Sequence, residues 1–398
     1  MLVRPSYVLG GRAMQIVYDD DGLAAALGER AAAGSLGGEG GLSASRPVLV
    51  DRFLEDATEV DVDALRDATG GFLIGGIMEH VEEAGVHSGD SACVLPPATL
   101  SADTQAVITE YTHRLADELG VVGLLNVQYA VKKGQVFVIE ANPRASRTVP
   151  FVAKATGVPL VKVAARLMAG AAAAGAADAV TTLESLRAEG LLHPPVDGNH
   201  VAVKEAVLPF NRFPDTDAVL GPEMRSTGEV MGIDSSYAMA FAKSQLAAGT
   251  RLPQSGTVFL SLADRDKHLG VEAAQILHEL GFRIVATEGT ARALEAVGVP
   301  VAQVVAKVGD EQGLDALDLI ADGRIALVVN SPRGRGSRAD GAHIRHAAGE
   351  HRVPLVTTGA AALAAARGLA EWANQKLTVR TLQEFHRGEL GDQLALPL

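Results

Sequence analysis

Residues 126–147, NVQYAVKKGQVFVIEANPRASR, contain two strand-like runs separated by the polar triplet KKG. This pattern predicts two antiparallel strands joined by a tight hairpin turn. On the second strand Glu140 and Asn142 are two residues apart, so both side chains point to the same face. Gln128 on the first strand offers an amide oxygen. We therefore expect three oxygen donors to converge on one face of the hairpin.

Three oxygen donors suit a hard cation such as Mg²⁺, which takes few protein oxygens and completes its shell with phosphate oxygens and water. Arg144 and Arg147 follow directly and can bind an anion. The combination is typical of phosphoryl transfer, in which a metal bridges phosphates and guanidinium groups stabilise developing charge. The spacing alone equally permits a second interpretation, in which Glu140 is a solvated hairpin carboxylate and Arg144 is its ion partner on the surface.

The rest of the chain up to residue 170 mixes strands and helices in the manner of an antiparallel α+β sheet. Residues 108–119 show the clearest amphipathic helix pattern. An alanine-rich stretch at 169–179 indicates a helix end and a spacer, and turn residues at 247–256 predict a domain boundary. The predicted strands of this part are 48–54, 71–78, 124–131 and 135–140.

After the boundary, strands and helices alternate, which predicts an α/β domain with a parallel sheet and right-handed crossovers. Helices are expected at 271–280 and 360–370. Strands are expected at 257–263, 283–287, 301–306, 325–330 and 353–357. Ligands of such sheets bind beyond the carboxyl ends of the strands.

Lysine, hydroxyl and amide side chains follow these strands, a set that suits a nucleoside monophosphate. The candidates are Lys267, Thr287, Thr290, Lys307, Asn330 and Ser331. Arg333, Arg335 and Arg338 either add positive charge at the same edge or belong to a solvated loop.

Composition narrows the class of protein. A chain of 398 residues with 47% hydrophobic content can build two or three domains with sizeable cores. Its net charge of −13 argues against nucleic acid as a partner. No apolar run reaches the ~18 residues of a membrane span, and the first residues lack the pattern of a signal peptide, so we expect a soluble cytoplasmic protein. The single cysteine, Cys93, excludes an internal disulfide.

The run at 140–170, EANPRASRTVPFVAKATGVPLVKVAARLMAG, resembles the ATP-grasp signature in the second, carboxy-terminal synthetic half of the large subunit of carbamoyl-phosphate synthetase. Further matches lie at 4–14, 73–93 and 204–232, and segment 257–398 is similar to the methylglyoxal-synthase-like domain that closes the same subunit. The resemblance implies an α+β ATP-grasp domain, incomplete at its N-terminus, at 1–170. A connecting helical and loop segment at 171–250 and an α/β methylglyoxal-synthase-like regulatory domain at 251–398 complete the expected organisation.

The resemblance also implies roles for individual residues. Gln128, Glu140 and Asn142 match the ligands of Mg²⁺ or Mn²⁺, and Arg144 and Arg147 match cations beside the transferred phosphate. Positions that line the ATP are Arg4, Arg52, Leu54, Glu59, Gly85, Val86, His87, Ser88, Gln128 and Glu140. Positions that bind ornithine in some relatives are Glu82, Asp90, Glu205 and Thr357 or Thr358. The effector candidates named above match positions that bind UMP or IMP.

The function implied is MgATP-dependent phosphorylation of carbamate to carbamoyl phosphate, serving arginine or pyrimidine synthesis. Glutamine is hydrolysed on a separate small subunit in this family, so that subunit and the missing N-terminal part of the large subunit are the expected partners, with an oligomer as the expected assembly. Because the match begins inside the ATP-grasp unit, we expect the chain to be a fragment. The alternative function is a non-catalytic nucleotide-binding regulator.

Overall fold

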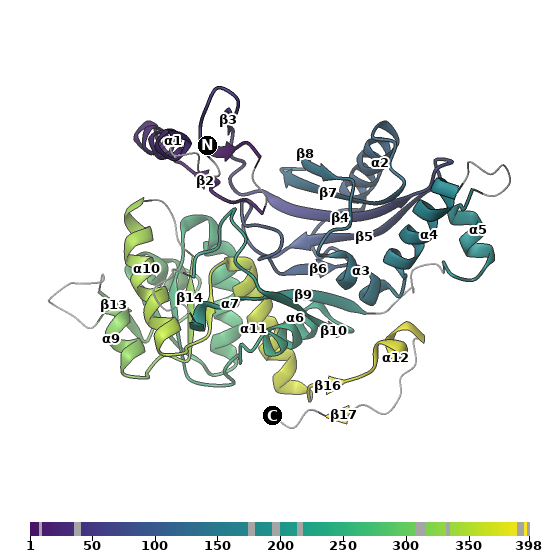
Figure 1. Cartoon of the computed structure of the whole chain (residues 1–398). Coiled ribbons are helices and arrows are strands. Elements are labelled where there is room, and N and C mark those ends of the chain that lie inside the picture. Colours follow the sequence, from purple (N-terminus) through teal and green to yellow (C-terminus); the bar gives the residue numbers. More distant parts are fainter. Residues whose placement is uncertain are drawn as a thin grey trace.

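The computed structural model describes residues 1–7, 10–35, 41–173, 180–192, 200–212, 218–306, 315–331, 335–387 and 394–395. Its largest feature is a seven-stranded sheet in the order β10-β9-β6-β5-β4-β7-β8, in which all neighbours are antiparallel (Figure 1). The strands are β4 (Thr58–Arg66), β5 (Phe72–His80), β6 (Cys93–Leu95), β7 (Gly123–Lys132), β8 (Gln135–Asn142), β9 (Val201–Val207) and β10 (Gly228–Asp234).

The predicted hairpin is present as β7 and β8. Its two turn residues, Lys133 and Gly134, both have positive φ, 51° and 77°. Such a turn matches the right-handed twist of the paired strands. Strand β8 forms one edge of the sheet and leaves Phe137, Val138 and Ile139 partly exposed.

Helices cover both faces of the sheet. Helix α2 (Ala102–Glu118) starts at the N-cap Ser101 and packs over an apolar cluster that includes Val62 and Leu125. Helices α3 (Val149–Thr156) and α4 (Leu160–Ala173) cover the end of the other face, followed by the short helix α5 (Leu183–Ala188). They approach closely because β5 has glycines there: a Cβ on Gly75 would lie 2.9 Å from Leu160, and one on Gly76 2.9 Å from Val152.

The segment at 171–250 differs from its expected helical and loop character. It contributes β9 and β10 to the sheet, and α6 (Tyr237–Ala247) packs against β10. The alternation of a strand is obscured there because β9 carries two adjacent charged residues, Lys204 and Glu205. Both are buried in the structure.

A small three-stranded sheet begins the chain. Its order is β2-β1-β3, formed by β1 (Leu2–Pro5), β2 (Gln15–Ile16) and β3 (Val48–Asp51), and α1 (Asp20–Ser35) packs beside it. The strand predicted at 48–54 therefore ends at Asp51.

The predicted parallel sheet is present after residue 256, in the order β13-β12-β11-β14-β15. Its strands are β11 (Thr257–Ser261), β12 (Arg283–Thr287), β13 (Gln303–Val305), β14 (Leu327–Asn330) and β15 (Leu355–Val356). Its helices are α7 (Lys267–Glu279), α8 (Glu288–Glu295), α9 (Ala316–Ala321), α10 (Arg335–Glu350) and α11 (Gly359–Asn374).

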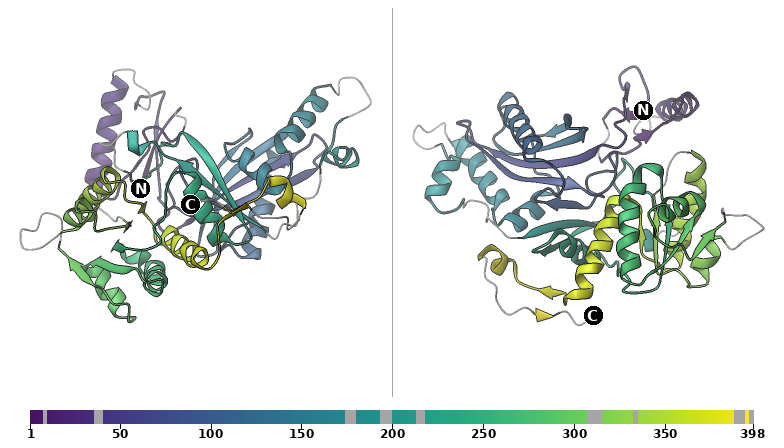
Figure 2. Two further views of the ribbon diagram at one scale, coloured as in Figure 1. Left: turned by 90° about the horizontal axis from the view of Figure 1, so that it is seen from below. Right: turned by 180° about the vertical axis from the view of Figure 1, so that it is seen from behind.

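The two large sheets share one apolar core. Val81, Val203 and Phe241 on the antiparallel side belong to the same buried cluster as Leu260 of β11 and Leu369 of α11. Figure 2 shows α6 and α11 between the two sheets.

After α11 the chain returns to the first part. Strand β16 (Thr378–Val379) pairs with β17 (Leu394–Ala395), and between them α12 (Leu382–Arg387) reaches α3. His386 Nε2 lies 2.7 Å from the carbonyl oxygen of Lys154. We call residues 375–387 the C-terminal strap.

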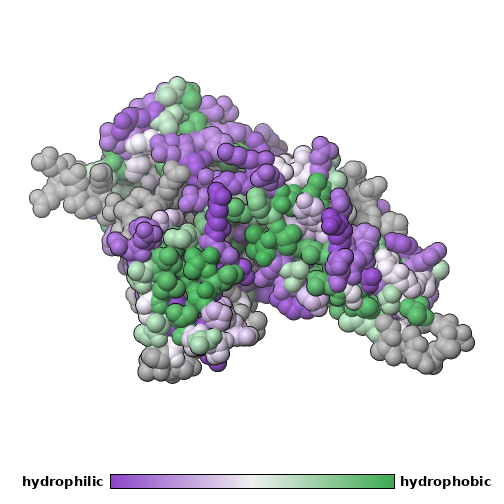
Figure 3. All heavy atoms as spheres, turned by 90° about the horizontal axis from the view of Figure 1, so that it is seen from above, coloured by the Kyte–Doolittle hydropathy of each residue, from purple (hydrophilic) through white to green (hydrophobic). Residues whose placement is uncertain are grey.

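The surface is mixed in polarity. Seen from above, hydrophilic side chains cover much of the molecule and apolar ones gather in separate patches (Figure 3). Within the described ranges, no helix is long and apolar enough to cross a membrane.

Candidate functional site

One face of the seven-stranded sheet carries the polar side chains. Glu59, Asp61 and Asp63 alternate along β4 and therefore share a face. Asp61 stands opposite Gln128 of β7, and Gln128 stands opposite Glu140 of β8. Directly opposed residues of antiparallel strands point to the same side. Asn142 is two residues beyond Glu140 on β8 and therefore points to the same side. Gln128, Glu140 and Asn142 thus share one face of the sheet, as the sequence predicted.

Glu140, Asn142 and Arg144 form an exposed cluster at the end of β8. The Asn142 amide donates to Glu140 Oε1 over 2.8 Å, and Arg144 Nη2 donates to Asn142 Oδ1 over 3.3 Å. One carboxylate flanked by an amide and a guanidinium is suited to a cation that also binds phosphate. Among the described residues, no group of three or more His, Cys, Asp or Glu side chains could hold a metal ion.

Arg147 lies beside the same face but points to other partners. Its Nη1 donates to Ser226 Oγ over 3.2 Å, and its Nε lies 3.5 Å from Glu229 Oε1. Arg144 thus belongs to the exposed cluster, whereas Arg147 contacts Ser226 and Glu229.

The loop at 82–91 lies over this face and is fastened to it. Gln128 donates to Ser88 Oγ over 2.9 Å, and Lys204 Nζ donates to the Ser88 carbonyl oxygen over 2.9 Å. The Gly85 N–H donates to Glu59 Oε1 over 2.8 Å. Burial raises the pKa of Glu59, although the neighbouring His80 opposes the change. Four predicted ATP positions thus form two hydrogen-bonded pairs, Gly85 with Glu59 and Gln128 with Ser88.

His87 belongs to the same loop. Its backbone N–H donates to the Gly221 carbonyl oxygen over 2.8 Å, and its Nδ1 accepts from the Gly89 N–H over 3.0 Å. Burial lowers the pKa of His87, which favours the neutral imidazole.

Not all predicted ATP positions lie in this cluster. Arg4 pairs with Asp51 over 3.2 Å inside the three-stranded sheet, and Arg52 is exposed on the connection that follows. The glycine pair Gly10–Gly11, which follows Arg4, is packed against the segment at 222–224. A Cβ on Gly11 would lie 1.7 Å from the Pro222 carbonyl oxygen, and the Met224 N–H donates to the Gly10 carbonyl oxygen.

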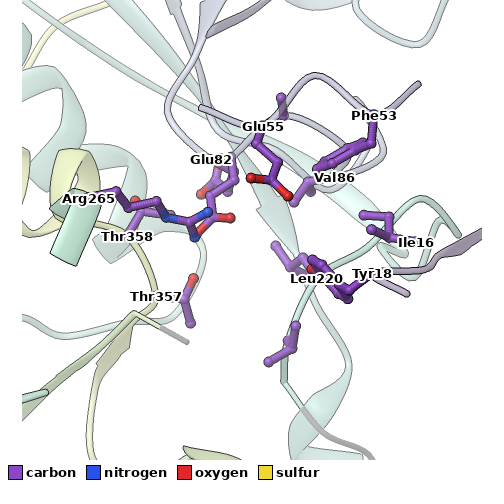
Figure 4. Close-up of a pocket in the computed structure, with 14 residues that line it drawn as sticks. Ile16, Tyr18, Phe53, Glu55, Glu82, Val86, Leu220, Arg265, Thr357 and Thr358 are labelled. Atoms are coloured by element: carbon purple, nitrogen blue, oxygen red, sulfur yellow. The ribbon is translucent and has the colours of Figure 1, made fainter. Parts of the chain in front are cut away.

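A cavity of about 370 Å³ opens beside the loop, between the antiparallel part and the parallel sheet (Figure 4). One side is apolar and aromatic, with Phe53, Val86 and Leu220 facing it. The other side is polar and includes Glu82 and Arg265, and Arg265 pairs with Glu83. The lining residues are Ile16, Tyr18, Phe53, Glu55, Glu82, Glu83, Ala84, Gly85, Val86, Val219, Leu220, Arg265, Thr357 and Thr358.

Sequence reasoning missed several of these residues. Tyr18, Phe53, Leu220 and Arg265 come from four separate segments, and no short spacing links them. Only the tertiary fold brings them together.

The predicted ornithine positions are divided by the structure. Glu82 and Thr358 line the cavity, whereas Asp90 accepts the backbone N–H groups of Arg225 and Ser226 over 2.7 and 2.8 Å. Glu205 is buried and accepts from Gln245 over 2.6 Å. Burial, reinforced by the Glu82 carboxylate, raises the pKa of Glu205 to about 8.

The predicted effector positions that the structure describes gather at the carboxyl edge of the parallel sheet. Thr290 Oγ1 accepts the Leu262 N–H over 2.9 Å, and Ser331 Oγ accepts the Ala263 N–H over 2.8 Å. Two of the candidates therefore fix the segment that leads into Lys267. Lys267 itself pairs with Asp264 over 2.8 Å.

The other effector positions have different surroundings. Thr287 Oγ1 lies 3.3 Å from Thr290 Oγ1, and buried Asn330 accepts from Arg345 over 2.7 Å. Lys307 and Arg333 lie outside the described residues. Arg335 and Arg338 fall within the first turns of α10, and only their backbone is described.

Comparison with known proteins gives two family matches. Residues 1–174 match the family model of the carbamoyl-phosphate synthase L chain, ATP binding domain, and residues 270–357 match that of the MGS-like domain. The expected α+β ATP-grasp and α/β fold classes are thereby confirmed.

The curated relatives that align with nearly the whole chain are much longer than it is. The chain is 51% identical over 403 residues to the carbamoyl phosphate synthase large chain of Mycobacterium tuberculosis, and 49% identical over 387 residues to that of Archaeoglobus fulgidus. Each alignment covers 97% of this chain but 34% of the relative, so the chain spans about a third of the length of these curated relatives.

Similar solved structures include the biotin carboxylase domain of Hydrogenobacter thermophilus 2-oxoglutarate carboxylase, with 14% identity and a TM-score of 0.45 over 62% of this chain and 55% of that one. Rhizobium etli pyruvate carboxylase matches with 20% identity and a TM-score of 0.39 over 52% of this chain and 17% of that one. These likenesses are too distant to bear on function.

Proposed function

Because the chain carries the ATP-binding domain of carbamoyl-phosphate synthase large chains together with an MGS-like domain, we propose that it supplies part of an ATP-dependent ligase that phosphorylates carbamate to carbamoyl phosphate. The observation that carries the proposal is the polar face on which Gln128, Glu140 and Asn142 converge beside Arg144. A glutamine-hydrolysing small subunit and the remaining two thirds of the large chain are its proposed partners.

The residues present fit a bound Mg²⁺ because a carboxylate and two amide groups face the same side of the hairpin. Glu140, Gln128 and Asn142 would hold it. When bound, the ion neutralises the charge of the ATP phosphates and orients them.

The chain's own cations have a separate part in the proposed reaction. Arg144, in the exposed cluster, and Arg147, beside the same face, would stabilise negative charge on the phosphoryl group during its transfer to carbamate. Gln128 and Lys204 hold Ser88, so the covering loop keeps a fixed position above the phosphates.

The nucleoside end of ATP would enter the cavity beside Gly85. Its apolar side, formed by Phe53, Val86 and Leu220, suits a purine ring, since flat aromatic ligands bind in mostly apolar clefts. The Glu59 carboxylate, fixed by the Gly85 N–H, stands at the start of the loop.

The test is MgATP binding to the 398-residue chain by calorimetry. Glu140→Ala is expected to weaken Mg²⁺-dependent binding at least about tenfold, the loss of one charged ligand. Because Glu140 is exposed, the melting temperature should stay unchanged. Glu118→Ala, on the exposed end of α2, is the matched control. Equal MgATP affinity in the wild type and in Glu140→Ala would exclude this metal site.

The parallel sheet supports the alternative function of a nucleotide-binding regulator. Thr290 and Ser331 fix the segment before Lys267 at the sheet edge where ligands of α/β domains bind. Calorimetry with UMP and IMP on the wild type and on Lys267→Ala tests it. Unchanged affinity in the variant would remove Lys267 from the site.

A further inference from the structure

An arginine of the parallel-sheet part reaches across to the loop at 82–91. Arg265 lies in the short 3-10 turn η2 (Asp264–Asp266) between β11 and α7. Its guanidinium pairs with Glu83, which is 182 residues earlier in the chain. Two further carboxylates are near: Asp56 Oδ1 lies 3.9 Å from Nη1, and Asp266 Oδ2 lies 3.3 Å from Nε. The side chain is 23% exposed, so the pair is partly shielded from water.

On one side of this pair lies the effector edge. Arg265 is two residues before Lys267 and two residues after Ala263, whose N–H is held by Ser331. Asp266 also accepts the Gly359 N–H at the start of α11 over 3.1 Å. Any movement of Lys267 or Ser331 on binding an anion would therefore move the backbone that carries Arg265.

On the other side lies the proposed nucleotide loop. The Val86 N–H donates to the Glu83 carbonyl oxygen over 3.2 Å, which makes residues 83–86 a tight turn. Gly85 has φ 93°, and a Cβ there would lie 2.7 Å from Phe53. The turn is closely packed, so a shift of Glu83 would be passed on to Gly85 and Val86, which line the cavity.

We propose that Arg265 is a positioning residue for the nucleotide site and that the Arg265–Glu83 pair couples this site to the edge of the parallel sheet. The pair holds the turn at 83–86 in the conformation that receives the nucleoside. An anion at the sheet edge changes nucleotide affinity by displacing Arg265. This inference rests on the proposed function, because it assigns a control element to the same nucleotide site.

The experiment measures MgADP affinity of the full chain by calorimetry, with and without saturating UMP. Arg265→Ala and Glu83→Gln should each weaken MgADP binding about three- to tenfold, in the lower range of couplings between sites. In both variants UMP should no longer change MgADP affinity. The double variant should be no weaker than either single variant, because both remove the same interaction. Arg265→Lys, which keeps the positive charge among Glu83, Asp56 and Asp266, should retain most of the affinity.

Arg367→Ala is the control, since Arg367 pairs with Glu272 over 2.6 Å on the outside of the parallel-sheet part, and it should leave MgADP affinity unchanged. Melting temperatures of all variants verify folding. Two results would overturn this inference but not the proposed function. One is wild-type MgADP affinity in Arg265→Ala and Glu83→Gln, and the other is additive losses of affinity in the double variant. A wild-type chain that does not bind MgADP would overturn the proposed function as well.

Discussion

At the residue scale, the buried charges of β9 distinguish this chain from an ordinary sheet. Lys204 is fully buried and donates to the Ser88 carbonyl oxygen, and Glu205 next to it points to the opposite face, toward Gln245. Burial and the Glu82 carboxylate raise the pKa of Glu205 to about 8. Glu205 is therefore mostly protonated in the folded protein near neutral pH.

The raised pKa of Glu205 predicts a pH-dependent stability. Between its ordinary value of 4.5 and about 8, the folded protein keeps a proton that the unfolded chain has released. The stabilisation is complete below pH 4.5 and is lost as the pH rises through 8. Glu205→Gln, which cannot ionise, should lie close to the wild type at pH 5 and exceed its unfolding free energy by about 4 kcal/mol at pH 9.

Urea denaturation at several pH values makes this comparison. Glu279→Gln, on the exposed end of α7, is the control and should show no such difference. A constant difference between Glu205→Gln and the wild type from pH 5 to pH 9 would contradict the assigned pKa.

The sequence was enough to predict those site residues that lie together on one strand or on one hairpin. Glu140, Asn142 and Gln128 could be placed on one face because strand periodicity fixes the direction of alternate side chains. Arg265 and Phe53 could not be found, because their place at the cavity depends on how two sheets pack.

At the element scale, strand-like runs predicted β3, β5, β7, β8 and the five strands of the parallel sheet, with ends that moved by a few residues. The strands β4, β6, β9 and β10 of the large sheet were not predicted. The failure at β9 and β10 has a local cause: charges in one strand and glycines in the other obscure the alternation. Gly232 of β10 has a structural reason, since a Cβ there would lie 2.0 Å from the Ala240 carbonyl oxygen of α6.

This close approach predicts opposite effects for two glycine substitutions. Gly232→Ala should lower the unfolding free energy by about 2 kcal/mol or more, because strand and helix must separate. Gly28→Ala, in α1 with no atom within 4 Å of the added Cβ, should raise it by about 0.5–1 kcal/mol through helix propensity. Thermal denaturation of both variants tests the pair. Similar effects of the two substitutions would show that α6 does not press on β10 in this way.

At the scale of the whole molecule, the antiparallel and parallel sheets share a core instead of meeting at a polar interface. Phe241 of α6 is buried in the cluster that includes Leu260 and Leu369 of the parallel-sheet part. Helices α6 and α11 touch closely, as a Cβ on Gly368 would lie 2.8 Å from the Ala238 carbonyl oxygen. The sequence boundary at 247–256 thus does not separate two independent cores.

The shared core predicts a single cooperative unfolding transition. Phe241→Ala should lower the unfolding free energy by about 3–5 kcal/mol and move the whole transition, because both sheets lose a common contact. Differential scanning calorimetry measures this. Two separate transitions, of which only one moves in the variant, would show that the parts unfold independently.

The C-terminal strap gives the molecule a defined response to mechanical load. Because α12 is attached to α3 through His386 and Lys154, a pulling force applied at the carboxyl end acts first on the antiparallel part and not on α11. The parallel sheet stays shielded until that attachment gives way. A cellular machine that unfolds the chain from this end would therefore have to detach the strap before it could strain the parallel sheet.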